Sequence, residues 1–340
     1  MCVGSGIDLA KAFHKQIKPN ITPSKINIFK RYGTAMISHD NYKIEFVGAR
    51  KESYSKDSRN PSIEIGDFMD DMNRRDFTIN TLAISLNKEN YGSLIDTFNG
   101  IDDLNNGIIK TPTDPDKTFS DDPLRMLRAV RFACQLDFYI DKNTVESIIK
   151  NSDRIKILSS ERIADEVNKI LMSKTPSNGF KNLEKLKILN NIIPELIDLK
   201  GIEEVEGQTH KDNFYHTLEV VDNICAKTDN LWLRWAALLH DIGKSPTKKF
   251  NKNIGWTFHG HEYVGSKMVK EIFTRLKLPL NDSMKYVQKI VMMSSRPIII
   301  AEEIVTDSAV RRLIYDAGDS IDDLLTLCEA DITTKNKRKF

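Results

Sequence analysis

The sequence predicts an α+β protein, in which a small mixed sheet with helices precedes a mostly α-helical body. Three observations favour this class. The first stretch of about 50 residues alternates strand-like and helix-like patterns. From Phe77 almost to the end, apolar residues recur at the helical period. The chain has 340 residues, more than one average domain, so we expect two or three domains.

The composition excludes several classes of protein. Apolar residues make up 40% and charged residues 29%, a mixture typical of chains that bury real cores. No apolar run approaches the ~18 residues that a membrane helix needs, and the first residues lack the basic and apolar regions of a signal peptide. The four cysteines lie far apart, which favours a reducing compartment. We therefore expect a cytoplasmic protein rather than a secreted, membrane or disulfide-stapled one.

The N-terminal part is predicted to hold one helix and three short strands. An amphipathic pattern covers 9–17. Gly33 and the polar run at 39–41 separate the strands, as turn residues do. The strands are Ile26–Phe29, Thr34–Ser38 and Lys43–Val47. Residues 51–66 are polar and poorly periodic, so a loop is predicted there.

Helices are predicted along most of the remaining chain. They cover 77–86, 120–135, 143–151, 160–173, 178–189, 214–227, 231–241, 260–275 and 283–293, with shorter ones after 301. Pro176, Pro194 and Gly201 interrupt this pattern, and the polar stretch 200–212 is the best linker candidate. We therefore divide the chain into residues 1–110, 111–200 and 213–340.

A first group of chemical residues lies in the run Arg74–Asn80, which we expect to open a helix. Two adjacent guanidinium groups are forked, permanently charged donors that can grip a triphosphate. Asp76 and Asn80 are four apart, so on a helix they share a face. Asn80 can then reach a ribose hydroxyl while Asp76 holds an arginine. Taken alone, this run is more typical of an N-cap aspartate behind two solvated arginines.

Asp122 and Arg125 form a second group, because on a helix a spacing of three projects them side by side. A carboxylate accepts hydrogen bonds and a guanidinium donates them, which suits the amino group and ring nitrogen of both cytosine and adenine. Guanine and uracil would leave buried polar groups unpaired, so the pair would discriminate against them. Taken alone, the pattern also fits an ordinary ion pair, with Arg128 and Arg131 on a solvated face.

A third group is rich in histidine and aspartate. His216 lies on a predicted helix, His240 and Asp241 end an apolar one, and Asp331 stands near the C-terminus. Imidazole and carboxylate together are ligands of borderline metals. Five of the seven histidines fall between 210 and 261, including His259 and His261. This clustering predicts a metal site, beside which Lys244 can meet a phosphate.

Several of these stretches carry a resemblance to a known family. They are Gly4–Ala10, Tyr32–Ala35, Glu45–Tyr54, Arg74–Asn80, Asp96–Leu104, Asp121–Ala133 and Glu161–Glu166. In this order they resemble the class II tRNA nucleotidyltransferase and poly(A) polymerase family, above all the bacterial CCA-adding enzymes with a C-terminal HD domain. The resemblance implies a nucleotidyltransferase head with a partial palm over 1–110, a nucleotide- and tRNA-binding neck over 111–200 and an all-α HD domain over 213–340.

The resemblance also implies roles for individual residues. The motif that binds triphosphate and ribose matches Arg74, Arg75, Asp76 and Asn80. The pair that serves as a protein template for C and A matches Asp122 and Arg125, with Arg128 and Arg131 following in the same motif. Glu45 matches an acidic residue beside catalytic Mg²⁺ ions, and Asn99–Leu104 resembles an element that lets one pocket switch from CTP to ATP. The HD metal ligands, for a divalent transition metal, are expected to be His216, His240, Asp241, His259, His261 and Asp331.

The implied function is tRNA 3′-end maturation and repair, by template-independent addition of C and A from CTP and ATP. The partners would be tRNA and the two nucleotides, with no membrane. An alternative is an autonomous HD phosphohydrolase that acts on phosphorylated or cyclic RNA ends. A third interpretation is a non-catalytic tRNA-binding remnant.

The chain departs from the family's pattern at its N-terminus. Relatives start with a Gly-Gly-x-Val-Arg-Asp segment and an Asp-x-Asp strand that runs almost directly into Gly-Ser-Gly. Here Met1–Val3 occupies the place just after that strand. We interpret the chain as a fragment at one or both ends.

We expect the 340-residue chain alone to bind CTP and ATP weakly and not to add them to tRNA. Nucleotidyl transfer needs two Mg²⁺ ions about 3.5–4 Å apart, and the pair needs a shared carboxylate ligand. Glu45 is the remaining candidate, because Asp8 lies beyond Gly4–Gly6 on the following helix. The measurement is incorporation of labelled CTP and ATP into tRNA that ends before CCA, with an N-terminally extended version as control. Metal-dependent addition by the chain alone would show that its catalytic carboxylates lie elsewhere.

Overall fold

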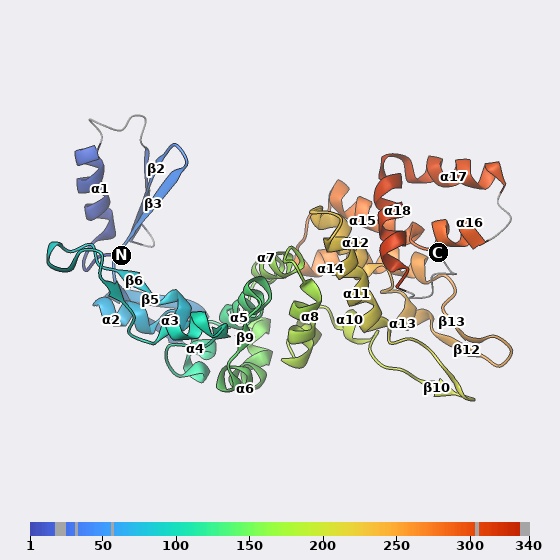
Figure 1. Ribbon diagram of the computed structural model, residues 1–340, viewed down its shortest axis with the longest axis horizontal. Coiled ribbons are helices and arrows are strands. Elements are labelled where there is room, and N and C mark those ends of the chain that lie inside the picture. The colour runs from blue at the N-terminus through green and yellow to red at the C-terminus, as the bar shows by residue number, and fades with distance from the viewer. Residues whose placement is uncertain (18–24, 31–32, 56–57, 303–305, 334–340) are drawn as a thin grey trace. The chain divides into compact units, whose positions relative to one another are not determined.

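The computed structural model describes residues 1–17, 25–30, 33–55, 58–302 and 306–333, and for 52–55, 58–63 and 302 it describes the backbone alone. The chain forms two compact units, Met1–Asp122 and Pro123–Phe340 (Figure 1). The first unit is α+β and the second is almost entirely helical, which confirms the predicted fold class. The proposed division of the second unit near 200–213 stays a prediction. No helix in the described ranges combines the length and apolarity needed to cross a membrane.

The first unit is built from small sheets with short helices. Its helices are α1 (Gly6–Ile17), α2 (Phe68–Asn73), η2 (Thr78–Asn80), η3 (Lys88–Asn90), α3 (Gly100–Asn105) and α4 (Pro115–Asp121). Its strands are β1 (Lys25–Phe29), β2 (Thr34–His39), β3 (Tyr42–Val47), β4 (Arg50–Ser55), β5 (Ser58–Ile65), β6 (Ala83–Ile84), β7 (Leu94–Ile95) and β8 (Ile108–Ile109). The first three strands form one antiparallel sheet in chain order, and β4 pairs with β5.

Helix α1 packs closely on the end of the first sheet. A Cβ on Gly6 would lie 2.7 Å from the backbone nitrogen of Gly48 and 2.8 Å from the carbonyl oxygen of Phe46, so only glycine fits there. Cys2 forms a parallel bridge with Gly48, in which the Cys2 amide donates to the Val47 carbonyl at 2.9 Å. This close approach fixes where the Gly-Ser-Gly segment meets β3.

Two predictions for the first unit are wrong. The expected loop at 51–66 is instead the β4–β5 hairpin, because backbone pairing builds this ladder without the alternating apolar pattern by which a strand is recognised. The expected helix at 77–86 is a 3₁₀ turn followed by β6. Phe77 is fully buried, whereas Ile84 pairs with Leu94 and is 63% exposed, so these apolar residues do not share a helical face.

The second unit contains the predicted run of helices. They are α5 (Leu124–Leu136), α6 (Lys142–Asn151), η4 (Ser152–Ile157), α7 (Ser160–Leu171), α8 (Pro176–Lys185), α9 (Leu189–Ile192), α10 (Pro194–Ile197), α11 (Asn213–Cys225), α12 (Leu231–Leu239), α13 (Lys244–Thr247), α14 (His261–Leu276), α15 (Asp282–Met293), α16 (Arg296–Glu302), α17 (Asp307–Ala317), η5 (Gly318–Ser320) and α18 (Ile321–Asp331). Its strands are β9 (Tyr139–Ile140), β10 (Glu204–Val205), β11 (Gln208–Thr209), β12 (Lys249–Asn251) and β13 (Gly255–Thr257). The linker predicted at 200–212 therefore carries the β10–β11 hairpin.

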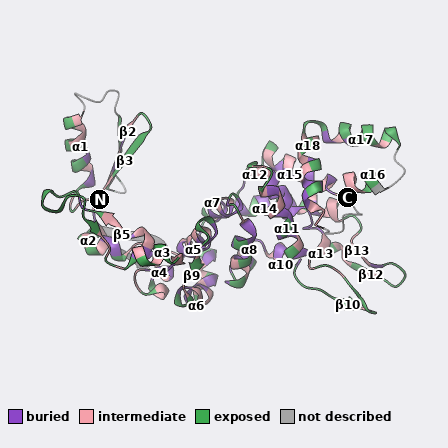
Figure 2. Cartoon of the chain, viewed as in Figure 1, coloured by how far each residue is buried: buried purple, intermediate pink, exposed green. Residues whose placement is uncertain are grey.

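Helix α12 forms the centre of this unit. Its apolar sequence is buried on nearly all sides against α11, α14 and α15, where buried residues are concentrated in Figure 2. Trp235 is fully buried and packs edge-on against Phe273, with ring centroids 5.9 Å apart. Its indole nitrogen donates to Asn168 Oδ1 on α7 at 2.8 Å, so the same side chain joins α12 to the preceding helices.

A buried arginine on α12 joins two helix ends. The Arg234 guanidinium is 3% exposed and donates to the carbonyls of Leu171 (3.1 Å) and Ser173 (3.2 Å), at and just after the end of α7. It also donates to the carbonyls of Cys225, the last residue of α11, and of Thr228 in the turn that follows. Carbonyls at helix C-termini lack intrahelical donors and carry partial negative charge, so one guanidinium satisfies several of them.

We predict that Arg234→Met lowers the free energy of unfolding by about 3 kcal/mol or more, because several buried carbonyls lose their donor. The matched control is Arg275→Met, which removes an exposed bidentate pair with Glu195 and should cost at most about 1 kcal/mol. Urea unfolding followed by tryptophan fluorescence measures both. Equal midpoints for the two variants would contradict the role given to Arg234.

Candidate functional site

The two adjacent arginines of the first unit are held by one buried carboxylate. Asp71 is 1% exposed, and its Oδ1 accepts from Arg74 Nε at 2.9 Å while its Oδ2 accepts from Arg75 Nη2 at 3.2 Å. The sequence reasoning missed Asp71. Its spacing of three and four residues before the arginines is the signal that could have revealed it. The pair is therefore fixed in place, with both guanidinium groups partly exposed.

The polar residues after the arginines form a second set of contacts. Asn80 Nδ2 donates to Asp76 Oδ1 at 3.0 Å, although no helix spans these two residues. Arg75 Nη1 donates to the Asn80 carbonyl at 2.7 Å. The helix expected to start here is absent, because Arg74 caps the end of α2 and only the 3₁₀ turn η2 follows. These four residues nevertheless lie together, as a donor-rich surface backed by two carboxylates.

The segment predicted to switch between nucleotides is anchored at its start. Asn99 has the left-handed φ of 56°, and the Asp96 carboxylate accepts from the amides of Gly100 (2.7 Å) and Ile101 (3.0 Å). A Cβ on Gly100 would lie 2.4 Å from the Thr78 carbonyl oxygen, so this segment packs directly on the turn between the arginines and Asn80. Its switching role stays a prediction.

Asp122 and Arg125 do not share one helix, so the predicted helix at 120–135 is wrong in this respect. Proline disfavours the helical conformation of the residue before it, and Asp122 is accordingly extended, with φ −137° and ψ 99°. Asp122 ends α4 in the first unit, whereas Arg125 lies in the first turn of α5 and is 9% exposed. The base-reading role of the pair therefore stays a prediction that helical spacing does not support.

The other arginines of α5 lie on its partly exposed side. Arg131 Nε donates to Glu166 Oε2 on α7 at 2.6 Å, and its guanidinium carbon lies 4.0 Å from the Phe132 ring centroid. The Arg128 guanidinium lies 5.2 Å from the same centroid. Glu166, which is 3% exposed, is thus a partner that the sequence reasoning did not name.

Glu45 lies exposed on β3, in register with Met36 of β2. In the described part of the chain, no group of three ligating side chains within 4.8 Å of one another includes it. The described residues of the first unit therefore do not assemble a two-ion carboxylate site, and its role beside Mg²⁺ stays a prediction.

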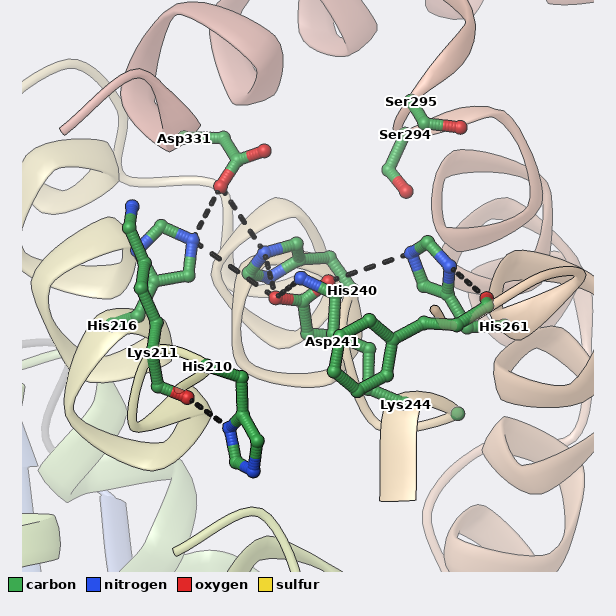
Figure 3. A network of polar contacts seen from close by, with 12 residues as sticks. His210, Lys211, His216, His240, Asp241, Lys244, His261, Ser294, Ser295 and Asp331 are labelled. Atoms are coloured by element: carbon green, nitrogen blue, oxygen red, sulfur yellow. Dashed lines mark hydrogen bonds and ion pairs between the residues drawn. The ribbon is translucent and has the colours of Figure 1, made fainter. Parts of the chain in front are cut away.

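The histidines and aspartates of the second unit do come together. His216 from α11, His240 just after α12 and Asp331 at the end of α18 offer ligand atoms within 4.8 Å of one another (Figure 3). His216 Nε2 lies 2.8 Å from Asp331 Oδ1 and 3.9 Å from Asp241 Oδ2. Three helices that are distant in sequence thus place imidazole and carboxylate groups around one point.

The chemistry of His240 fits a metal ligand. Its Nδ1 lies 2.8 Å from the Ala237 carbonyl, which only accepts, so Nδ1 carries a proton. Its Nε2 is buried without a hydrogen bond of good geometry and lies 3.4 Å from both Asp241 Oδ2 and Asp331 Oδ1. A lone pair that faces two carboxylates requires a cation between them, either a proton or a metal ion. A backbone carbonyl on the other ring nitrogen is the arrangement that orients metal-bound histidines.

Charge interactions at this cluster are strong because it is buried. Burial opposes a charge on His240, but the Asp241 and Asp331 carboxylates outweigh it and raise the pKa of His240 to about 10. Burial also opposes ionisation of Asp241, yet His240 and Lys244 hold its pKa well below the usual range. The pKa of Asp331 is lowered in the same way, against burial, by His216 and His240. Both carboxylates therefore stay charged and favour a cation.

The predicted phosphate contact Lys244 and the remaining predicted ligands lie at different distances from this point. Lys244 Nζ donates to Asp241 Oδ2 at 2.6 Å, and His261 Nε2 lies 3.6 Å from Asp241 Oδ1. His261 Nδ1 donates to the Phe258 carbonyl at 2.9 Å. His259 is exposed and lines an open hollow beside the cluster. Metal ligation by His259 and His261, like the rest of the ligand set, stays a prediction.

Models of known families match three stretches of the chain. A family model described as the poly A polymerase head domain matches residues 4–110. One described as a probable RNA- and SrmB-binding site of polymerase A matches 137–199, and an HD domain model matches 213–334.

Individual relatives of the chain agree with these family matches. The chain is 31% identical over 270 residues to an A-adding tRNA nucleotidyltransferase of Deinococcus radiodurans, covering 77% of this chain and 59% of that protein. It is 32% identical over 276 residues to a multifunctional CCA protein of Shewanella frigidimarina, covering 77% and 63% respectively. The chain thus spans about three fifths of the length of these two relatives.

Solved structures show the same fold. An apo form of a CCA-adding enzyme matches 99% of this chain and 72% of its own with a TM-score of 0.67 at 22% identity. A tRNA nucleotidyltransferase in complex with a primer tRNA and an ATP analogue matches 96% and 84% with a TM-score of 0.65, also at 22% identity.

The α+β unit thus carries a poly A polymerase head domain match with its paired arginines, and the helical unit carries an HD domain match with its clustered imidazole and carboxylate groups. The chain belongs to the class II tRNA nucleotidyltransferase and poly(A) polymerase family, which confirms the resemblance found in the sequence.

We predict that a divalent transition metal binds the His240 cluster more tightly as the pH rises. The metal must displace the proton that a pKa of about 10 keeps on His240, so affinity should rise roughly tenfold per pH unit between pH 7 and 9. Co²⁺ titrations at three pH values measure this.

The double variant His240→Ala with Asp241→Ala should lose the metal, whereas His14→Ala in the first unit should retain it. Full metal content in the double variant by elemental analysis, or an affinity that does not change with pH, would contradict the assignment.

Proposed function

We propose that this chain acts in tRNA 3′-end maturation and repair, in the template-independent addition of C and A from CTP and ATP. The observation that carries this proposal is the surface formed by Arg74, Arg75, Asp76 and Asn80, which lies in a head domain of this family. Relatives named as A-adding and CCA-adding enzymes support the same activity. A cytoplasmic location, favoured by the isolated cysteines, is part of the proposal.

The geometry supports triphosphate binding in particular. Asp71 holds each arginine through one carboxylate oxygen, to which the Nε and Nη2 atoms of that arginine donate. Permanently charged, forked donors match phosphate oxygens in pairs, and a fixed guanidinium loses less rotamer freedom when it binds. The tie to Asp71 therefore prepares the surface for a polyphosphate.

Selection of C and A is proposed to come from Asp122 and Arg125. Their opposite hydrogen-bonding character suits the amino group and ring nitrogen that cytosine and adenine share. Arg125 is buried, which makes an unpaired contact with the wrong base costly. Arg128 and Arg131 are proposed to contribute to binding of nucleotide or tRNA from the same helix.

Mg²⁺ is proposed as the ion of nucleotidyl transfer, as in the family, with Glu45 as a ligand. The described residues do not complete that site. For tRNA, the helices within 137–199 are the proposed binding region, because they match the RNA-binding family model. A relative's complex with a primer tRNA and an ATP analogue fits these partners.

Two variants should separate base selection from triphosphate binding. Asp122→Ala should reduce the preference for CTP and ATP over UTP and GTP by about tenfold, because it removes the group that repels the wrong bases. Asp71→Asn should instead weaken all four nucleotides by a similar factor of roughly ten, since it releases the arginines. Equilibrium binding of the four nucleotides to the chain measures both effects. Unchanged selectivity in Asp122→Ala would remove the templating role.

A second candidate function is a metal-dependent phosphohydrolase in the HD unit. The observation that favours it is the buried Nε2 of His240, which faces two carboxylates beside Lys244. A divalent metal held there supplies the charge that makes water a stronger nucleophile. Lys244 is proposed to hold a substrate phosphate, because its ammonium lies at the edge of the open hollow. Release of phosphate from RNA with 2′,3′-cyclic or 2′-phosphate ends tests this, and no release by the metal-loaded chain would refute it.

A further inference from the structure

An open hollow of about 350 Å³ lies beside the HD cluster, and much of its wall is aromatic. It is lined by Lys244 and by the segment Trp256–Glu262. The His210 ring contacts both Trp256 on β13 and Phe258 just after it, so these two rings lie on the same side of the hairpin. The sequence places two large rings next to each other at the entrance to the metal ligands.

Neighbouring aromatic rings pack against Trp256 and Phe258, which both remain partly exposed. Phe250, the cross-strand partner of Trp256, lies 5.3 Å from it between ring centroids, with the ring planes at 69°. His210 contacts both Trp256 and Phe258, at 5.1 and 6.1 Å, with planes at 82° and 88°. The Trp256 indole nitrogen donates to the Gln208 carbonyl at 3.1 Å. None of these contacts is a face-to-face stack.

A lysine connects the aromatic wall to the HD cluster. Lys244 Nζ lies 5.8 Å from the Phe258 ring centroid and 2.6 Å from Asp241 Oδ2. The centroid of the Phe258 ring therefore lies within about 8 Å of Asp241 Oδ2. The face of the Phe258 ring also attracts the Lys244 ammonium. This span is of the order of the separation between the phosphorus and the base within one nucleotide. A phosphate beside Lys244 thus places a base at Phe258 or Trp256.

We propose that this hollow is a nucleobase subsite, in which Phe258 and Trp256 stack on the base of a terminal nucleotide. The nucleotide's 2′- or 3′-phosphate then lies at Lys244 and the HD ligands. The proposal rests on the second candidate function and names its substrate class, an RNA end or free nucleotide with an unpaired terminal base. Stacking uses the face that every base has, so the subsite discriminates little between bases.

The experiment compares two substrates that share one reacting group. Adenosine 2′,3′-cyclic phosphate carries a base, whereas glycerol 1,2-cyclic phosphate has the same five-membered cyclic phosphodiester without one. In Phe258→Ala and Phe258→Leu, the ratio of kcat/KM for the adenosine substrate to that for the glycerol substrate should fall about tenfold, and Phe258→Trp should retain the ratio. Phe250→Leu is the control, because Phe250 packs in the same hairpin but does not line the hollow. An unchanged ratio in Phe258→Ala would overturn the proposal.

A binding measurement decides the proposal if neither substrate is hydrolysed, an outcome that would refute only the phosphohydrolase function. Calorimetry uses adenosine 2′-phosphate and the chain with Arg74→Ala and Arg75→Ala, so that the head does not contribute. Phe258→Ala in this background should weaken binding about tenfold, and Phe250→Leu should not. Equal affinity with and without the Phe258 ring would overturn the subsite.

Discussion

The helical unit depends on the neutralisation of one buried carboxylate. Asp241 is 3% exposed, and an ionised carboxylate in such a place is tolerated only with close positive partners. Lys244 supplies one, and the imidazoles of His216 and His240 face it. Asp331 then joins the cluster from 115 residues beyond His216, which requires α11, α12 and α18 to be packed correctly. The packing of these helices and the affinity for a cation are therefore linked.

The same constraint recurs at other buried charges in the described part of this protein. Asp71 is paired with Arg74 and Arg75, Glu166 is paired with Arg131, and the Arg234 guanidinium is surrounded by carbonyls. Each pairing fixes long side chains that would otherwise be mobile. At Asp71 the consequence is a prepared surface of donors, and at Arg234 it is a fixed junction between helix ends. Buried charge serves here to position groups, more than to add stability.

The two candidate sites offer a phosphate opposite electrostatic surroundings. The first unit offers guanidinium groups, whose charge is permanent and whose donors are fixed by a carboxylate behind them. The HD cluster instead gathers negative charge, so it needs a bound cation before it can attract a phosphate, with Lys244 as its positive neighbour. Triphosphate binding in the first unit should thus depend little on metal at the HD cluster. The aromatic wall at Trp256 and Phe258 adds to the HD unit a contact that does not depend on charge.

The sequence by itself determined the family, the α+β then helical order and most helix positions, because these depend on local periodicity and on motifs of fixed spacing. It also determined that histidines cluster between 210 and 261. It did not reveal the β4–β5 hairpin, whose pairing lacks an apolar pattern, or the extended Asp122 before Pro123. Only the tertiary structure decided that Asp71 ties both arginines and that Asp331 meets His216. Contacts such as the latter join residues far apart in sequence, and their distance depends on how whole helices pack.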